Sequence, residues 1–107
     1  MMGKIYGGSS TVVLATGGTG LVTAAGKAGI LRGYSLKCGT DISKVIFRDG
    51  GSGGTIKWSD GNAAVTVAGD VFKTHSFKED VPFSTDIYAT VTGTGAILYT
   101  EYVQTED

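Results

Sequence analysis

The sequence contains a single cysteine, Cys38, and a single histidine, His75, among its 107 residues. One cysteine cannot form a disulfide within the chain, which excludes the class of small secreted proteins that are stapled by several bridges. One cysteine and one histidine also cannot supply the ligand set of a structural zinc site. We therefore expect a fold that is held by its apolar core, with Cys38 as a small strand residue and with no metal and no cofactor.

Long apolar runs and charge of one sign are absent as well. No stretch approaches the ~18 to 20 apolar residues of a membrane span, and the N-terminus lacks the apolar segment of a secretion signal. Synthesis and folding in the cytoplasm are therefore expected. Nine basic and ten acidic residues give a net charge of -1 and are scattered along the chain. Because nucleic-acid binders carry a basic patch, neither nucleic acid nor an acidic membrane is an expected partner.

Proline occurs once and glycine eighteen times, and 41% of the residues are hydrophobic against 18% that are charged. This composition is typical of a folded chain of short strands and tight turns, and no window of ten or more residues has a helical pattern. The sequence predicts one all-β domain over residues 11–107: an antiparallel β-sandwich of jelly-roll type, with about eight or nine short strands. Residues 1–10 are loosely patterned and are predicted to form a flexible N-terminal arm.

The clearest local pattern lies near the C-terminus, in residues 86–103. Residues 87–92 alternate between apolar and polar or aromatic side chains, which is the period of a half-buried strand. A second apolar run covers residues 97–103, and Gly93 and Gly95 lie between the two runs. Glycines supply the positive φ angles of tight turns, so the segment is predicted to be a β-hairpin. Its second strand has large apolar groups on both faces, which indicates that something covers the outer one.

A strand-like run followed by Gly17-Gly18-Thr19-Gly20 resembles the phosphate-binding turn of dinucleotide-binding proteins. Thr23 stands where the third glycine of that fingerprint is required, and Gly26 interrupts the helix that should follow. A hairpin turn between strands at residues 11–16 and 21–25 is the favoured interpretation.

Residues at three other positions indicate turns or an irregularity in a strand. Asp49 and Asp60 each precede glycine in loop-like segments. A calcium loop needs several oxygen ligands at alternate positions, so both are predicted to be turn aspartates, with a weak calcium site assembled from separate loops as the alternative. Gly33 interrupts a strand predicted for residues 30–38, and it indicates a β-bulge or the close approach of another backbone segment.

Residues suited to catalysis are not grouped in the sequence. His75 is the obvious candidate base, and the side chain of Ser76 beside it points to the opposite face of a predicted strand. No G-x-S-x-G elbow is present, and Cys38 lies in a different strand. His75 is predicted to lie on a strand surface or to face a loop, and the chain is not expected to be an enzyme.

Aromatic residues remain as candidates for binding. Flat rings could form a platform for sugars, with nearby polar side chains bonding to the sugar hydroxyls. Packing in the core or in an interface is the favoured alternative, because tyrosine and tryptophan bury much area and retain a polar group. The aromatic residues considered are Tyr6, Tyr34, Trp58, Tyr88, Tyr99 and Tyr102. The candidate interface residues are Ile5, Tyr6, Trp58, Tyr99 and Tyr102.

From residue 29 onward, the order of features resembles small β-sandwich proteins of tailed bacteriophages that decorate or cement the capsid or form head fibres. The matching segments are GILRGY (29–34), VIFRDG (45–50), GT (54–55), Phe77, VPFST (81–85) and IYATVTGTGA (87–96). The resemblance implies a non-enzymatic virion protein, made in the host cytoplasm, that binds the major capsid protein on the outer capsid surface. It also implies a homotrimer at local three-fold positions that holds neighbouring capsomers together. A carbohydrate- or receptor-binding module of a phage fibre or appendage is the alternative.

Overall fold

The computed structural model describes residues 6–15, 19–23, 26–63, 65–67 and 71–105. These residues form strands and no α-helix, apart from the short 3-10 turn η1 (Gly51–Gly53), so the prediction of an all-β fold is confirmed. Nothing in this part of the chain forms a helix that could cross a membrane. The strands are β1 (Tyr6–Ala15), β2 (Thr19–Leu21), β3 (Gly29–Lys37), β4 (Ser43–Asp49), β5 (Thr55–Asn62), β6 (Phe72–Phe83), β7 (Ile87–Thr92) and β8 (Ile97–Gln104).

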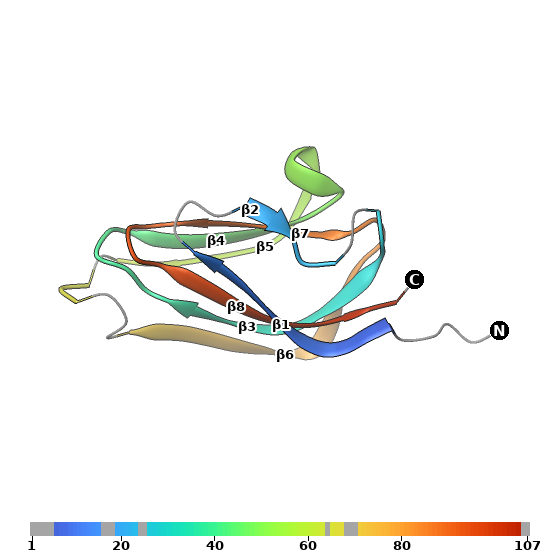
Figure 1. The fold of residues 1–107 in the computed structure, drawn as a ribbon, viewed down its shortest axis with the longest axis horizontal. Helices are drawn as coiled ribbons and strands as arrows, with labels where there is room; N and C mark the ends of the chain where they lie inside the picture. The colour runs from blue at the N-terminus through green and yellow to red at the C-terminus, as the bar shows by residue number, and fades with distance from the viewer. Residues whose placement is uncertain (1–5, 16–18, 24–25, 64, 68–70, 106–107) are drawn as a thin grey trace.

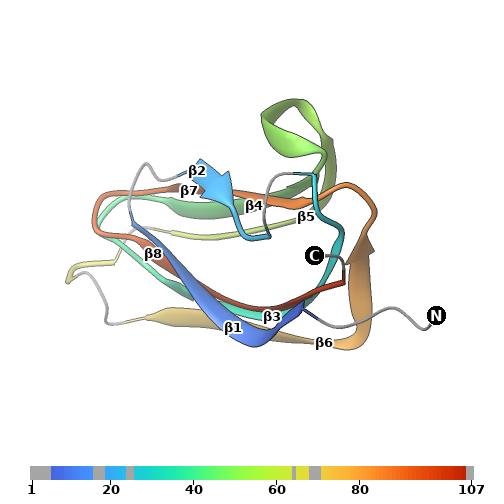
Figure 2. The ribbon, with the colours of Figure 1, turned by 45° about the vertical axis from the view of Figure 1, so that its right-hand side comes forward.

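The strands form two antiparallel sheets, which lie one above the other in Figures 1 and 2. The strand order is β1-β8-β3-β6 in the first sheet and β2-β7-β4-β5 in the second. The pairs are nested, because β1 pairs with β8, β2 with β7, β3 with β6 and β4 with β5. The chain therefore doubles back on itself between β4 and β5, and the paired ribbon wraps around to form both layers.

The core lies between the two sheets, where the period of the strands turns every second side chain inward. In β4, Val45 and Phe47 are fully buried, whereas Lys44 is exposed. Tyr34 of the first sheet meets Phe47 of the second, with ring centroids 5.5 Å apart. The buried apolar cluster draws on both sheets and comprises Val22, Leu31, Tyr34, Leu36, Val45, Phe47, Phe83, Ile87, Ala89, Val91, Ala96 and Leu98.

The hairpin predicted for residues 86–103 is wrong. β7 pairs with β2 and β4, whereas β8 pairs with β1 and β3 in the other sheet. The glycines do adopt positive φ angles, 117° at Gly93 and 80° at Gly95, and the Ala96 amide donates a hydrogen bond to the Gly93 carbonyl at 3.0 Å. They form a corner that carries the chain from one sheet to the other. The apolar alternation indicates which face is buried, but it does not identify the neighbouring strand.

The same correction applies near the N-terminus. β1 and β2 lie in different sheets, so the hairpin predicted around residues 17–20 is not formed. Strand β1 begins at Tyr6, inside the predicted arm of residues 1–10, and Tyr6 pairs with Gln104 of β8. Ile5 lies outside the described residues.

Three boundaries differ from the prediction. Residues 60–62 continue the pairing of β5 with β4, so Asp60 is a strand residue and not a turn aspartate. β6 runs through residues 79–80, where the sequence predicts a break. Residues 65–67 form no strand, and residues 66–67 form a bend, where the sequence predicts a strand over residues 64–68. For Asp60 the pairing of β5 with β4, which the local pattern does not contain, sets the boundary.

Gly33 lies at a bulge, which confirms the prediction from its position inside a strand. The register of β3 shifts between Leu31 and Gly33 against both neighbouring strands. A Cβ atom at Gly33 would lie 2.7 Å from the carbonyl oxygen of His75, which is too close for a carbon and an oxygen that are not bonded. The backbone of β6 therefore requires glycine at this position.

Replacing Phe47 by alanine should lower the free energy of unfolding by about 3 to 5 kcal/mol, because the fully buried ring leaves a cavity between the sheets. Ile56→Ala is the matched control. Ile56 is 52% exposed, so its truncation should change stability by no more than about 0.5 kcal/mol. Urea denaturation followed by tryptophan fluorescence measures both variants, and equal losses would contradict this placement of the core.

Candidate functional site

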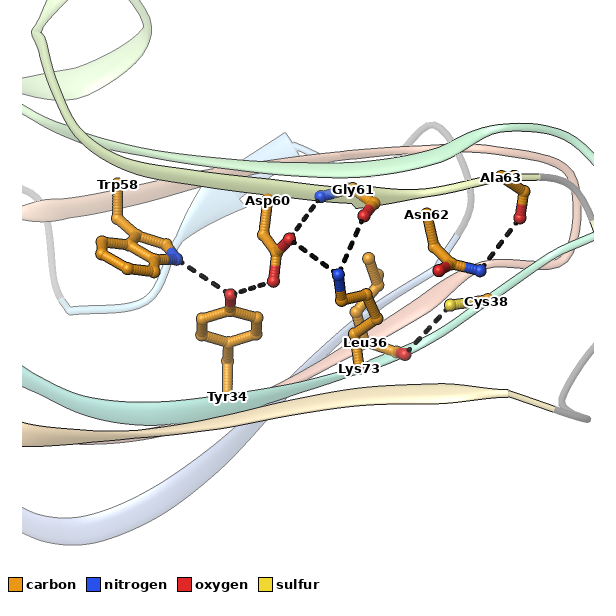
Figure 3. Close-up of polar contacts among 9 residues, drawn as sticks. All are labelled: Tyr34, Leu36, Cys38, Trp58, Asp60, Gly61, Asn62, Ala63 and Lys73. Carbon is orange, nitrogen blue, oxygen red and sulfur yellow. Dashed lines mark hydrogen bonds and ion pairs between the residues drawn. The ribbon is translucent and has the colours of Figure 1, made fainter.

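One side of the fold is closed by side chains and not by backbone pairing. β5 and β6 are edge strands of opposite sheets, and their inward-facing residues meet there with Tyr34 of β3. In β6, residues 73, 75 and 77 are half-buried, whereas residues 72, 74, 76 and 78 are exposed. Figure 3 shows Tyr34, Trp58, Asp60 and Lys73 of this group, which reach toward one another from the two sheets. We refer to the following six residues as the edge cluster: Tyr34, Trp58, Asp60, Lys73, His75 and Phe77.

The hydroxyl of Tyr34 is the polar centre of the edge cluster. It donates a hydrogen bond to Asp60 Oδ2 at 2.5 Å and accepts one from Trp58 Nε1 at 2.8 Å (Figure 3). The Gly61 amide donates to Asp60 Oδ1 at 2.7 Å, and Lys73 Nζ lies 3.4 Å from the same oxygen. In the described part of the chain, every buried side-chain nitrogen and oxygen has a partner. The cluster thus joins β3, β5 and β6 through hydrogen bonds that a charged carboxylate strengthens.

The rings of the edge cluster pack against one another beside this polar centre. His75 stacks on Trp58 with ring centroids 4.9 Å apart, and Phe77 meets both rings edge-on. His75 therefore faces inward, and the prediction of a histidine on the strand surface or facing a loop is wrong. The reason is that Trp58 comes from the opposite sheet, which the pattern of one strand cannot reveal.

The same contacts fix the protonation states in the edge cluster. Burial, together with the hydrogen bond to Asp60, raises the pKa of Tyr34 well above its ordinary value. Burial alone would also raise the pKa of Asp60, but the hydrogen bonds from Tyr34 and the Gly61 amide and the charge of Lys73 lower that pKa below its ordinary value. Near neutral pH, Tyr34 is protonated and Asp60 is ionised. Neither group has a pKa near 7, where general acid or base catalysis is efficient.

Cys38 directly follows β3 and is fully buried, and its Sγ donates to the carbonyl of Leu36 at 3.6 Å. Burial raises the pKa of the thiol and outweighs the opposing effect of Lys73. Because the thiolate is the reactive form, this environment disfavours nucleophilic chemistry. The residue packs, as the sequence predicts.

Two carboxylates hold the loops at the end of the fold that carries η1. Asp49 accepts hydrogen bonds from the amides of Ser84 and Thr85, each at 2.8 Å. Burial opposes the ionisation of Asp49, but these bonds outweigh it and lower its pKa. Asp86 is buried and accepts bonds from three glycine amides, the shortest of them 2.9 Å from Gly51. Asp49 is the last residue of β4 and pairs with Thr55 and Ile87, so the prediction of a turn aspartate is wrong for Asp49 as well. The described residues contain no group of three or more metal-ligating side chains.

Four large apolar side chains are exposed in the segment between β3 and β4 and in the segment from the end of β5 to the first residue of β6. The segment between β3 and β4 and the start of β6 lie on the left in Figure 1, at the end opposite η1. Ile42 is 62% exposed and Phe72 is 51% exposed. The two loops that carry the patch adjoin, because the Cys38 amide donates to the Val71 carbonyl at 2.8 Å and the Val65 amide donates to the Gly39 carbonyl at 3.2 Å. We refer to these four residues as the loop-end patch: Ile42, Val67, Val71 and Phe72. Sequence reasoning missed this patch, because its members come from separate segments and the run at 64–68 resembles a buried strand.

The predicted interface residues lie in different settings. Tyr6 begins β1, and Ile5 lies outside the described residues. Trp58 is half-buried in the edge cluster. Tyr99 alternates with the buried residues of β8 and so lies on the outer face of the first sheet, whereas Tyr102 packs partly against the core. The structure therefore does not bring Trp58, Tyr99 and Tyr102 together.

Comparison with known proteins does not assign the chain to a family. No protein-family model matches the sequence, and no curated protein matches it. A function must therefore be inferred from the residues and their geometry.

Replacing Tyr34 by phenylalanine should lower the free energy of unfolding by about 1 to 3 kcal/mol, because Asp60 and the Trp58 indole both lose their partner in a partly buried site. Tyr88→Phe is the control, since Tyr88 is half-exposed in β7. Chemical denaturation of the two variants measures the difference. Equal stabilities would show that the hydroxyl of Tyr34 does not help to join the sheets.

Acid should remove the stabilisation that Asp60 provides. The pKa of Asp60 is lowered by folding, so its contribution is present above the unfolded pKa of about 3.9 and is lost as the pH falls through the folded pKa. Asp60→Asn should therefore flatten the acid limb of a plot of melting temperature against pH. Asp80→Asn, which changes a surface carboxylate 3.7 Å from Arg32, is the control and should leave that limb in place. Parallel acid limbs for the wild type and Asp60→Asn would contradict this role.

Proposed function

We propose that the chain is a non-enzymatic virion structural protein of a tailed bacteriophage that binds the outer capsid surface as a decoration or cement protein. The observation that carries the proposal is the loop-end patch. Of the five large apolar side chains exposed in the described part of the chain, four belong to this patch. Apolar residues that gather in this way mark a protein contact, whereas scattered ones do not. The sequence resemblance supplies the partner, which is the major capsid protein.

We propose further that the two packed sheets form a jelly-roll sandwich. The nested pairing of β1 with β8, β2 with β7, β3 with β6 and β4 with β5 supports this assignment. A jelly roll consists of eight strands in two sheets that are linked as two Greek keys, and wrapping a doubled chain produces this order. The same architecture serves in viral capsid and lectin domains, so it is compatible with the proposed role without specifying it.

The surroundings of the patch suit a protein partner. Exposed threonines, Thr40, Thr66 and Thr94, lie in the loops that carry or adjoin the patch. The carboxylate nearby, Asp41, accepts a hydrogen bond from the hydroxyl of Thr94. Protein interfaces commonly have an apolar centre with few charges and a polar rim. Lys37, the strand partner of Phe72, adds a positive charge to this rim, and the composition as a whole is compatible with a protein partner.

The loops at this end are braced before any partner binds. The Thr40 amide donates to the Thr94 carbonyl at 2.8 Å, and the Gly39 amide donates to Ser43 Oγ at 2.8 Å. A Cβ atom at Gly39 would lie 1.9 Å from the Thr94 carbonyl oxygen, so these two loops touch through their backbones. Loops that are ordered in advance lose less conformational entropy on binding. The loop that carries Ile42 is therefore prepared for contact before a partner binds.

The oligomeric state and location follow from the resemblance. A homotrimer at local three-fold positions would contact several capsomers at once, and repeated weak contacts raise the overall affinity. Such a protein would be made in the host cytoplasm and would end on the capsid surface. Light scattering gives the oligomeric state directly, and a strict monomer would count against this part of the proposal.

The alternative of a sugar platform around Trp58 receives no support from the geometry. The indole is stacked on His75 and contacts Phe77 edge-on, and its Nε1 donates to Tyr34. The ring and its N–H are therefore engaged in closing the side of the fold.

Phe72→Ser and Ile42→Ser should each weaken binding to the capsid of the encoding virus by about tenfold or more, because a buried apolar anchor is typically worth about 1 to 2 kcal/mol or more in an interface. Both side chains are more than half exposed, so the fold should be retained. Co-sedimentation of the purified protein with capsids that lack it measures the affinity.

Ile56→Ser is the matched control, since Ile56 is also exposed but lies at the far end of the fold, at the start of β5. Capsid binding should survive this change. A wild-type protein that does not sediment with capsids, or one whose binding is unaffected by both patch variants, would overturn the proposal.

A further inference from the structure

A hollow of about 180 Å³ lies on the face of the first sheet that points away from the second sheet. The strand register explains its position. One row across the sheet contains Tyr99 of β8, Ser35 of β3 and Thr74 of β6. The next row contains Glu101, Gly33 and Ser76 in the same strands, so the middle position of that row has no side chain. We refer to this space, which Gly33 borders, as the outer-face hollow.

The hollow is built into the backbone. Gly33 cannot carry a larger side chain, because a Cβ atom would lie 2.7 Å from the carbonyl oxygen of His75. Beside it, the register of β3 shifts between Leu31 and Gly33. At this point several additional residues of β6 lie opposite the single residue Arg32. A bulge of this kind re-aims side chains and often adjoins a binding site. The gap between Glu101 and Ser76 is therefore a fixed feature of the sheet.

The side chains around the hollow offer a ring, hydroxyls and one carboxylate. Tyr99 is half-buried at its border. Ser35 Oγ and Thr74 Oγ1 lie 2.9 Å apart and share a hydrogen bond, and either hydroxyl can be the donor. Ser76 and Glu101 are exposed. Among the described residues, no lysine or arginine lines this space.

We propose that the outer-face hollow binds one neutral hexopyranose unit of a glycan. The ring of Tyr99 supplies an apolar surface for the C–H face of the sugar, and the hydroxyls of Ser35, Thr74 and Ser76 can both donate to and accept from sugar hydroxyls. The carboxylate of Glu101 accepts from hydroxyl donors and repels acidic sugars, as it also repels phosphate and sulfate groups. The volume is below the roughly 300 Å³ of pockets for drug-sized ligands, which limits the site to a single ring.

The hollow and the loop-end patch are separate surfaces. The patch lies at one end of the fold, whereas the hollow lies on a sheet face between residues 33–35, 74–76 and 99–101. Glycan binding therefore does not depend on the proposed capsid role, and either proposal can fail alone. A chain attached to a surface through its loop end would keep this sheet face free, and many copies would add the avidity that one shallow site lacks.

The affinity of an open site of this size should be weak, with a dissociation constant on the order of 1 mM, because little ligand surface is buried. The test is therefore a titration of the ¹⁵N-labelled full chain, followed by amide chemical shifts, up to about 50 mM ligand. The probes are the methyl pyranosides of glucose, galactose, mannose and N-acetylglucosamine, with glycerol and glucuronic acid as controls. At least one pyranoside should give saturable shifts confined to residues 33–35, 74–76 and 99–101, and the controls should not.

Variants decide whether the hollow is the site. Tyr99→Ala should weaken binding by at least about tenfold, whereas Tyr99→Phe keeps the ring and should stay within about threefold. Tyr88→Ala, on the other sheet, should bind like the wild type. Glu101→Ala changes an exposed side chain and tests the hollow even where Tyr99→Ala does not fold. Glu101→Ala should also weaken binding, because it removes an acceptor for the sugar hydroxyls. The proposal is overturned by the absence of saturable shifts for all four pyranosides, by equal shifts with glycerol, or by unchanged binding in Tyr99→Ala, or in Glu101→Ala where Tyr99→Ala does not fold.

Discussion

The open side between β5 and β6 is the constraint on which the rest of this structure depends. Two stacked sheets leave unpaired edges, and here one pair of edges is bridged by the hydroxyl of Tyr34, which reaches from the first sheet to Asp60 and Trp58 in the second. The bridge succeeds because each polar atom in it has a partner, since a half-satisfied polar group in a low-dielectric site is destabilising. The rings of His75 and Phe77 then exclude water from the same side.

The nested strand order explains how much of the fold could be predicted from the sequence. The all-β class follows from composition and periodicity, and the glycines at 93 and 95 do take positive φ angles. Among the described strands, however, only β4 and β5 are neighbours both in sequence and in a sheet. A glycine-rich turn between two strands is compatible with a hairpin and also with a corner between sheets. The choice depends on distant partners, such as Gln104 for Tyr6, which no local pattern encodes.

The same limit applies to the candidate sites. Gly33 was predictable as a bulge, because a glycine inside a strand commonly marks a bulge or the close approach of another backbone. The hydroxyls of Ser35, Thr74 and Ser76 could not be placed together, since their proximity follows from the register of β3 with β6. The loop-end patch was hidden for a related reason, because apolar loop residues look like short strands until the strands are known. Burial of Trp58 likewise required its partners from the opposite sheet.

The interior side chains of this chain therefore stabilise the fold, whereas its surface residues are available for binding. The side chains with the richest chemistry are committed to holding the fold: Tyr34 and Asp60 to the bridge, Asp49 and Asp86 to the loop amides, and Cys38 to the core. Substituting them changes stability before it changes any surface. The loop that bears Ile42 and the sheet that bears the hollow are in turn fixed by backbone contacts at Gly39 and Gly33. A scaffold of this kind can exchange its surface residues freely while glycine stays at these two positions, so binding specificity is set on the surface and rigidity is set beneath it.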